Sequence, residues 1–567
     1  MTPLRRPGVE LPGQTGVLAA MLVLFFLASS SVFAQAPAMN GGLSKEEEAG
    51  RRIYLEGRSS SGEPLRAWIR GDVPVSGTIL PCVKCHRRSG MGAREGSKVV
   101  PPVTGASLYR PREFYGTTPA LAGYLGQKSY PTYTDETLAK CIVSGVDPNG
   151  RVMDPVMPRY DMDDGDLHLL IAYLKSLSIG APGVTDNVLR FATVVDTSVG
   201  PAKRKAMLDV LRRAFRDLNA GTRHESQRSL RYSYGAGNRY HAYRLLALEI
   251  WELSGPEKTW EAQLEERYRR EPVFAMVSGI AAGRWEPVHR FCERHGIPCV
   301  LPNTDLPDLD DHDYFTVYFS KGMALEAEAI ARYLETDGKP EGDGPIVQVY
   351  TDGERETAAA GVFREAMRKR GAGKVRDVGI RNGEALTAEI WRNRIGADRP
   401  SVIVLWVPDP DLAGLEGMGD PPSFLPAIFL STSLGAGPET RIPRMVAGRV
   451  FLAHPFLLPS EERRRTDRAT IWLKARNFTG ADVRLQVNTF FAANLVGRAV
   501  KAMFRFFSRD YFLEIVEHET ESVPWPTVYP RVSLGPGQRF ASKGCYILRY
   551  PEKPGGAMTS SGDWVVP

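Results

Sequence analysis

The short motif CVKCH at residues 82–86 constrains the fold of this chain more than any other feature. It places two thiols one helical turn apart and an imidazole directly after the second thiol, in a 567-residue chain that contains only six cysteines. Ligands at this spacing suit a structural zinc site, a redox-active dithiol or a covalently attached haem. Each of the three requires a different arrangement of the chain around the motif.

The residues around the motif favour haem attachment. A zinc site needs a second closely spaced ligand pair, and the remaining cysteines offer none: Cys141, Cys292, Cys299 and Cys545. A thioredoxin-like dithiol follows a strand and begins a long helix, whereas Pro81 and several glycines surround this motif with loop. We therefore expect Cys82 and Cys85 to bond the vinyl groups of one covalent haem c, with His86 as an iron ligand. Zinc and dithiol remain the alternatives if no haem is attached.

A methionine is the expected second iron ligand. Residues 150–178 contain Met153, Met157 and Met162, followed by leucines and an isoleucine at helical spacing that Asp163 or Asp164 could cap. The proline after Met157 favours extended backbone before it, which helps a loop side chain reach the iron. A packing role for all three methionines is the alternative.

Two stretches resemble the cytochrome c family. MPRY before DLHLLIAYLKSL resembles the distal loop and last helix of small monohaem cytochromes c, and AGRRIY resembles their first helix. The resemblance covers residues 45–178. It implies an all-α domain, one-electron transfer and Met157 as axial ligand, with Met153, Met162 and His168 as less favoured candidates. A His–Met iron leaves no open position for oxygen or peroxide chemistry.

Basic residues dominate the segment after the motif. Against the single Glu95 stand Lys84, Arg87, Arg88, Arg94, Lys98, Arg110 and Arg112. These residues form either an ordinary solvated face or a rim that steers an acidic redox partner toward the haem. Nucleic acid is not an expected partner of an exported chain.

The first residues predict export. Arg5 and Arg6 precede an apolar run at 17–28, and Val32 and Ala34 suit a signal peptidase. We expect a signal peptide at 1–34 and a periplasmic protein. An uncleaved anchor is the alternative, but the run is short for a bilayer span. Overall composition, with 43% hydrophobic and 24% charged residues, is ordinary, and a net charge of +6 is a weak signal in a chain this long.

The larger half follows a linker at 179–188 and precedes a tail at 551–567. Apolar strand-like runs alternate with helical ones over residues 189–550, which predicts parallel sheets covered by helices in two lobes. We find no P-loop, G-x-G-x-x-G, G-x-S-x-G or H-E-x-x-H motif. Binding without chemistry is therefore expected of this half, although an unrecognised active site stays open.

Residues 273–309, 314–334 and 345–353 resemble type I periplasmic binding proteins, in particular the branched-chain amino-acid and amide receptors. The resemblance implies a bilobal α/β module with a solute held between lobes at strand ends. By that resemblance the contacts would be Ser278, Gly279, Asn303, Thr304, Asp305, Tyr318, Tyr350, Thr351 and Asp352. The family's polar turn reads Pro-Ala-Ala-Thr or similar, whereas this chain has PNTD at 302–305, which argues against amino-acid specificity.

Cys292 and Cys299 lie on a predicted helix and the strand after it. In an oxidising compartment we expect them to form a disulfide, with two buried thiols as the alternative. Cys141 and Cys545 belong to different predicted domains, and we do not expect them to pair.

These observations predict an exported electron-transfer cytochrome whose second module binds a solute or a partner protein. Periplasmic dehydrogenases and other cytochromes are the expected redox partners. The alternative is a solute receptor or sensor whose haem reports redox state or ligand. An enzyme such as a peroxidase would require an open iron position.

Overall fold

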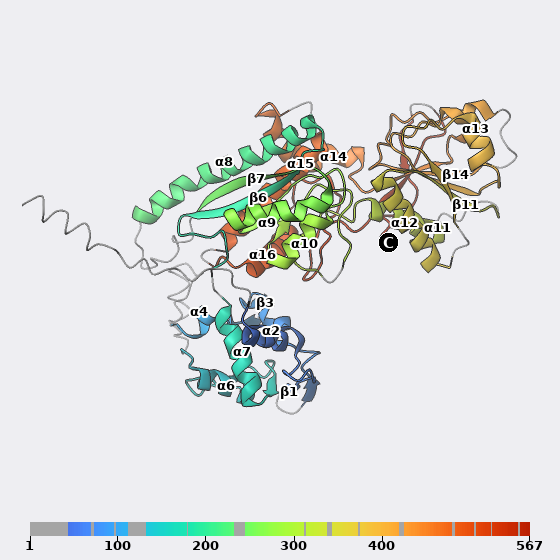
Figure 1. Ribbon diagram of the computed structural model, residues 1–567. Coiled ribbons are helices and arrows are strands. Elements are labelled where there is room, and N and C mark those ends of the chain that lie inside the picture. Colours follow the sequence, from blue (N-terminus) through green and yellow to red (C-terminus); the bar gives the residue numbers. More distant parts are fainter. Residues whose placement is uncertain are drawn as a thin grey trace, which may run out of the picture.

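The computed structural model describes residues 43–69, 73–95, 98–110, 132–177, 180–231, 244–310, 313–336, 343–371, 375–418, 425–478, 482–503, 506–522, 524–553 and 556–567. The predicted signal peptide at 1–34 and Arg112 lie outside the described residues. The described chain forms an N-terminal domain and a larger two-lobed body (Figure 1).

Two crossed helices form the frame of the N-terminal domain. Helix α2 (Lys45–Glu56) begins with a capping box, because Ser44 Oγ accepts from Glu47 N at 3.1 Å and Glu47 Oε2 accepts from Ser44 N at 2.7 Å. It packs against α7 (Asp164–Ser176), which Asp163 caps. The crossing depends on Gly50, since a Cβ there would lie 2.0 Å from the carbonyl oxygen of Leu169. The predicted cap at Asp163 is confirmed.

Among the described residues between α2 and α7, the chain forms three short helices. They are α3 (Cys82–His86), α4 (Gly105–Leu108) and α6 (Asp135–Ser144). Helix α6 has a capping box from Thr134 and ends at Gly145 in the left-handed region.

The prediction of an all-α domain is wrong, because the domain also contains two small antiparallel sheets. One sheet has the order β2-β1-β5, formed by β1 (Arg66–Ile69), β2 (Val73–Ser76) and β5 (Arg159–Asp161), and the other joins β3 (Ala93–Glu95) and β4 (Lys98–Val100). In the first sheet Ala67 pairs with Val75 and Tyr160. The segment between α2 and the CVKCH motif is therefore held against the strand that follows Met157.

The first lobe is a parallel sheet with helices on both faces. Its order is β10-β9-β8-β6-β7, from β6 (Val188–Asp196), β7 (Leu245–Leu253), β8 (Ala275–Val277), β9 (Cys299–Val300) and β10 (Thr316–Val317). Leu189 and Phe191 of β6 pack in a core with α8 (Pro201–Arg231), α15 (Val483–Ala502) and α16 (Arg509–Ser522). The alternate residues Ala192 and Val194 pack with α9 (Trp260–Arg270) and α10 (Glu286–His295). This alternation places one face of the strand against each helical layer.

The second lobe repeats this arrangement. Its sheet has the order β12-β11-β13-β14-β15-β16-β17, from β11 (Ile346–Thr351), β12 (Arg376–Ile380), β13 (Val402–Trp406), β14 (Ala427–Ser431), β15 (Val450–His454), β16 (Tyr546–Arg549) and β17 (Thr559–Ser560). Strands β11 to β15 pair in parallel, and β16 and β17 add antiparallel at one edge. The long helices of this lobe are α11 (Met323–Thr336) and α12 (Glu354–Lys369), and shorter turns are α13 (Ala388–Ile390), η2 (Trp391–Ile395), η3 (Ala413–Met418) and η4 (Arg444–Val446).

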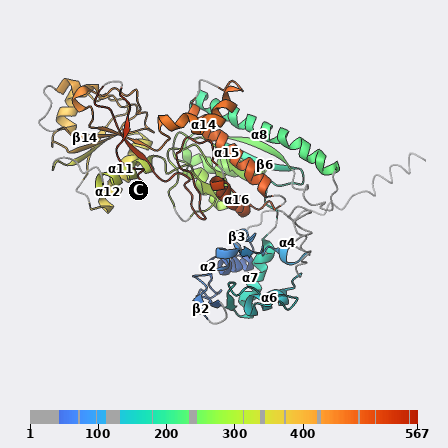
Figure 2. The same ribbon diagram turned by 180° about the vertical axis from the view of Figure 1, so that it is seen from behind.

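The chain passes between the lobes at several points. It leaves the first lobe between β10 and α11, returns between β15 and α14 (Pro459–Lys474), and enters the second lobe again at β16 (Figures 1 and 2). The passing segments bond one another, since Tyr318 N donates to Arg539 O and Ser542 N donates to Phe319 O, each at 2.7 Å. The predicted bilobal α/β architecture is present.

Candidate functional site

The CVKCH motif forms the single turn α3. Pro81 precedes it in extended conformation, and Arg87 ends it with φ +64°, in the left-handed region. Tyr54 of α2 donates its hydroxyl to Arg87 O at 2.6 Å, and Gly92 N donates to His86 O at 3.0 Å. These bonds fix the end of the turn, and with it the position of the His86 ring.

Cys82, Cys85, His86 and Met157 all line one cavity of about 460 Å³. Its other walls come from α2, α6, α7 and the segment 99–103, and most of the side chains there are apolar, including Val99, Val103, Leu108, Leu138, Ile142, Leu170 and Leu174. The structure therefore brings together the four residues that the sequence predicted to hold a haem. A concave, largely apolar cavity with two thiols on one wall fits a flat, apolar, covalently attached group.

The His86 ring is oriented by a backbone carbonyl. Its Nδ1 lies 2.9 Å from the carbonyl oxygen of Pro101. With the proton on Nδ1 directed to this oxygen, Nε2 is the ring nitrogen suited to ligate a metal. This arrangement is the one expected of a metal-ligating histidine.

Met157 sits in a loop held by its own neighbours. Met157 N donates to Asp154 O at 3.0 Å, and Arg159 donates to the carbonyl oxygens of both Met157 and Met153, the latter at 3.1 Å. Met153 also lines the cavity, whereas Met162 packs against the domain core. The side chain of His168 is 70% exposed, with Nε2 3.9 Å from Glu46. The cavity thus favours Met157 and Met153 over the other two candidates.

Burial keeps one thiol and two tyrosine hydroxyls of the cavity in their neutral forms. Burial raises the pKa of the Cys82 thiol to about 12, and burial likewise raises the pKa of the Tyr160 and Tyr54 hydroxyls. Tyr160 donates to Leu80 O at 2.5 Å, which ties β5 to the residue before Pro81. A reactive dithiol needs a lowered thiol pKa, so the environment of Cys82 does not suit that alternative. Within the described ranges, no three His, Cys, Asp or Glu side chains gather as a group that could hold a metal ion.

One residue of the predicted basic rim is bound by the bilobal module. Arg88 donates to Asp510 of α16 at 2.8 Å, and its guanidinium lies 4.2 Å from the centre of the Tyr314 ring. Lys84 and Arg110 are exposed, and the side chains of Arg94 and Lys98 are not among those described. A contact of this kind between residues over 400 positions apart has no signal in the sequence.

In the bilobal module, the predicted solute-binding residues lie at the carboxyl ends of β8, β9, β10 and β11. Asn303 Nδ2 donates to Ser278 Oγ at 3.0 Å and to Gly279 O at 3.3 Å, so these three are together. Gly279 has φ +113°, and a Cβ there would lie 2.7 Å from the Trp285 ring. Thr304 Oγ1 accepts from Leu306 N at 3.1 Å within the following turn.

Other predicted contacts are engaged elsewhere. Tyr318 is 1% exposed, its hydroxyl lies 2.8 Å from His289 Nδ1, and its ring is stacked between His289 and Phe540. Asp352 accepts from Asn382 N at 3.0 Å, while Tyr350 and Thr351 end β11. Tyr318 therefore serves packing, and Asp352 holds a loop.

Two ion pairs link the lobes near this site. Arg355 of α12 donates to Asp305 at 3.1 Å, and Arg284, just before α10, donates to Glu354 at 2.8 Å. Asp305, one of the predicted solute contacts, is thus already paired with the chain's own arginine. The sequence did not indicate these arginines, because their partners are 50 and 70 residues away.

The expected Cys292–Cys299 disulfide is not present in this structure, where all six cysteines are thiols. Both residues are fully buried in the core between β6 and α10, and Cys292 Sγ lies 3.6 Å from Met276 Sδ. Burial raises the pKa of the Cys292 thiol well above its usual value. Cys141 and Cys545 are likewise unpaired with each other.

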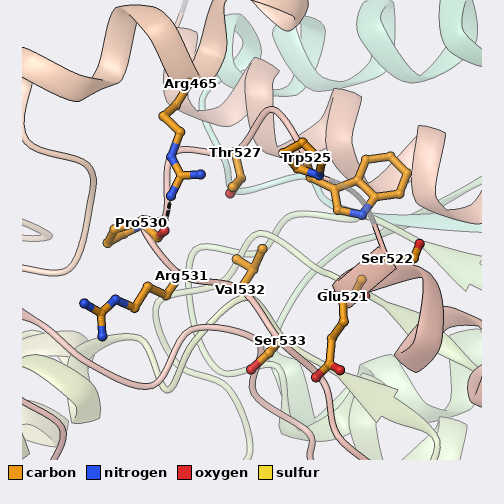
Figure 3. A pocket seen from close by; sticks show the side chains of 11 residues that line it. Arg465, Glu521, Ser522, Trp525, Thr527, Pro530, Arg531, Val532 and Ser533 are labelled. Carbon is orange, nitrogen blue, oxygen red and sulfur yellow. Dashed lines mark hydrogen bonds between the residues drawn. The ribbon is translucent and has the colours of Figure 1, made fainter. Parts of the chain in front are cut away.

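A second cavity, of about 430 Å³, lies in the first lobe near the end of α16 (Figure 3). Its lining includes Arg465, Glu521, Trp525 and Arg531, and Arg465 donates to Pro530 O at 2.5 Å. None of the residues predicted to bind solute lines it.

Together, the cavity and the fold define a class of protein: a domain shaped to hold a covalent haem, followed by a bilobal α/β module. Residues 80–178 match the family model described as cytochrome c. The chain therefore carries a cytochrome c domain. The match ends where the sequence placed the end of this domain, and it begins just before α3.

Solved structures with similar folds are transporter binding proteins. One is a branched-chain amino acid ABC transporter from Thermus thermophilus with bound valine, at 12% identity and a TM-score of 0.46, covering 68% of this chain and 98% of that one. Another is a fatty acid ABC transporter substrate-binding protein from Thermomonospora curvata, at 14% identity and 0.43, covering 69% and 96%. A third, an ABC transporter substrate-binding protein from Sphaerobacter thermophilus, has 13% identity and 0.45, covering 67% and 98%.

A search of curated proteins found no match to this chain. In the part of the chain that the structure describes, no helix is both long and apolar enough to cross a bilayer.

Proposed function

We propose that this protein is an exported c-type cytochrome that transfers single electrons through one haem c, and that its bilobal module binds a small solute or a partner protein. Cys82 and Cys85 would hold the haem through thioether bonds, and His86 and Met157 would ligate its iron. The observation that carries the proposal is that these four side chains line one cavity, with His86 Nδ1 directed to Pro101 O.

The chain's own residues support this role. When bound, the haem supplies reversible one-electron chemistry at its iron. The apolar walls exclude water, and Pro101 fixes which imidazole nitrogen faces the cavity. The hydroxyls of Tyr54 and Tyr160 are used to brace the backbone on either side of α3. If His86 and Met157 both ligate the iron, no position would be left open for substrate, which favours electron transfer over a peroxidase.

The partner of this domain would be a redox protein, such as a periplasmic dehydrogenase or another cytochrome. Lys84 and Arg110 remain exposed and could attract an acidic partner. Arg88 is used inside the chain, so the partner would approach a face of the domain that the module does not cover. The predicted signal peptide supports a periplasmic location.

In the module, Ser278, Gly279 and Asn303 would contact a solute between the lobes. The Arg355–Asp305 pair makes a zwitterionic amino acid a poor candidate, because the carboxylate of Asp305 is already bound to an arginine. The second candidate function, a receptor whose haem reports on solute or redox state, is favoured by one observation: the loop after His86 bonds directly to α16 of the module.

Covalent attachment is the direct test. The full-length protein, produced with its export sequence, should carry a single haem after denaturation, measured as intact mass and as haem stain. A protein with Cys82→Ser and Cys85→Ser should lose it, whereas Cys141→Ser should keep it. Haem retained by the double variant, or absent from the unmodified protein, would refute the proposal.

A further inference from the structure

A short loop joins the CVKCH motif to the bilobal module. Residues 87–92, here called the post-motif loop, lie against α16, below it in Figure 1. Ser89 donates twice to Glu514, from its backbone nitrogen to Oε1 at 2.8 Å and from Oγ to Oε2 at 2.5 Å. Ser89 is 3% exposed, and Arg88 beside it pairs with Asp510 one turn earlier on α16. Two adjacent residues of the loop are thus bound by two carboxylates of one helix.

The post-motif loop also sets the position of His86. Gly92 N donates to His86 O, and Ser89 Oγ accepts from Met91 N at 3.1 Å. The loop also contacts the segment that carries Pro101. Gly90 O accepts from Val103 N at 2.7 Å, and Val103 lies two residues after Pro101, whose carbonyl oxygen faces His86 Nδ1. A change at Ser89 would therefore reach both the backbone and the ring partner of His86.

Glu514 lies among charges from every surrounding element. Burial raises the pKa of the Glu514 carboxyl to about 7; the Ser89 hydrogen bonds lower it, and nearby carboxylates raise it further. The groups around it are Asp510, Tyr511 and Glu517 on its own helix, Tyr54, Arg87 and Arg88 from the cytochrome domain, and Tyr314 and Arg539 from the module. Arg88 and Arg539 are committed to Asp510 and Glu517, so neither is paired with Glu514 in this arrangement.

We propose that Glu514 is a positioning residue that couples electron uptake by the cytochrome domain to proton uptake at the junction of the domain with the module. The inference rests on the proposed function. Over the pH range in which Glu514 ionises, each electron delivered to the haem by a redox partner protein would be accompanied by the uptake of up to one proton from bulk solvent at a carboxylate oxygen of Glu514. This proton would offset the added negative charge, and the loop bonds would be kept.

The direction of the effect follows from Coulomb's law. A carboxylate whose field reaches the haem would favour the oxidised state, and a neutral carboxyl would not. The midpoint potential should therefore fall as pH rises from about 6 to about 8, because Glu514 ionises over that range. Ser89→Ala removes a bond that lowers the pKa, so the fall should move to higher pH.

The variant Glu514→Gln distinguishes the titration of the Glu514 carboxyl from its hydrogen bonds to the post-motif loop. Glutamine can accept from Ser89 N and donate to Ser89 Oγ, so it keeps the contact but carries no titrating proton. Glu514→Ala removes both. Glu521→Gln is the matched control, since Glu521 is an exposed residue of the same helix.

The experiment combines potentiometric titration with hydrogen exchange of the full-length haem protein. We expect a pH-dependent potential in the unmodified protein and in Glu521→Gln, and a flat one in Glu514→Gln. Protection of the Ser89 amide, corrected for intrinsic exchange, should persist in Glu514→Gln and drop at least about tenfold in Glu514→Ala.

An equal pH slope in Glu514→Gln and the unmodified protein would overturn the proposal, as would unchanged Ser89 protection in Glu514→Ala. Either result would leave covalent haem and electron transfer intact. A protein without haem would instead refute the proposed function itself.

Discussion

The Nδ1 atom of His86 lies 2.9 Å from the carbonyl oxygen of Pro101, 15 residues further along the chain. This pair fixes the imidazole so that its other nitrogen can face the cavity that Met157 also lines. This relationship supports the proposed ligation of the iron by His86 and leaves the opposite side of the cavity to Met157.

Met157→Ala should replace a six-coordinate low-spin spectrum by a high-spin one and lower the midpoint potential. We expect a fall on the order of 0.1 V, a part of the roughly 0.8 V range that axial ligands span. Potentiometry followed by visible absorption measures both. Met162→Ala is the control, because Met162 packs in the domain core and does not line the cavity. If Met153→Ala produced the change and Met157→Ala did not, the ligand assignment would move to Met153.

Gly50→Ala should destabilise the cytochrome domain by about 1–3 kcal/mol, the usual range for overpacking. The new Cβ would meet backbone atoms of Leu169 in α7, and backbone atoms cannot rotate away as the end of a side chain can. Denaturant unfolding followed by absorption of the domain measures this.

Gly361→Ala, in the middle of α12, is the control for that substitution. A Cβ at Gly361 meets no atom within 4 Å, so the same change should stabilise the module by about 0.5–1 kcal/mol. Equal effects at the two glycines would show that the close approach of α2 and α7 does not determine the outcome.

The caps and the motif were predictable from the sequence because each depends on neighbours within a few residues. Ser44 with Glu47, Gly57, and the CVKCH turn are of this kind, and the alternation of strands and helices likewise indicated two parallel sheets. Pairing of Ala67 with Tyr160 joins segments more than 90 residues apart, so the small sheet that makes the domain mixed rather than all-α left no local pattern.

The solute site shows the same limit. Ser278 and Asn303 follow neighbouring strands, and the resemblance to periplasmic binding proteins predicted that they lie together. The burial of Tyr318 between His289 and Phe540, and the pairing of Asp305 with Arg355, depend on how loops from both lobes fold over the sheet edges.

Glu326→Gln should raise the melting temperature at pH 8 and change it little at pH 5. Glu326 is fully buried on α11, where Ser433 Oγ donates to its Oε1 at 2.5 Å, and burial raises its pKa to about 7. A carboxyl with a raised folded pKa contributes its full stability below the unfolded value near 4.5 and loses it as pH rises through about 7. Ionisation at pH 8 then costs on the order of 2–3 kcal/mol, which glutamine avoids.

Glu335→Gln on the same helix is the control, because Glu335 pairs with Arg332 at the surface. Thermal unfolding at the two pH values measures the effect. Equal shifts for Glu326→Gln at pH 5 and pH 8 would mean that Glu326 is already ionised or already neutral at both.

The module should not bind branched-chain amino acids. Arg355 forms an ion pair with the carboxylate of Asp305, so this carboxylate is not available to bind the ammonium group of an amino acid. Titration calorimetry with valine, leucine and isoleucine should give no saturable heat at millimolar ligand. Saturable binding that is lost in Asp305→Asn would contradict this prediction. It would show that the Arg355–Asp305 ion pair breaks when ligand binds, and that the module binds amino acids as the similar receptors do.

The central claim is an iron with both axial positions filled by this chain's own side chains, working in electron transfer. The most direct measurement is the visible spectrum of the purified full-length protein, oxidised and reduced, without and with added peroxide. We predict a six-coordinate low-spin c-type spectrum in both states and no change on adding peroxide. A high-spin spectrum, or a new species formed with peroxide, would show an open iron position and contradict the account.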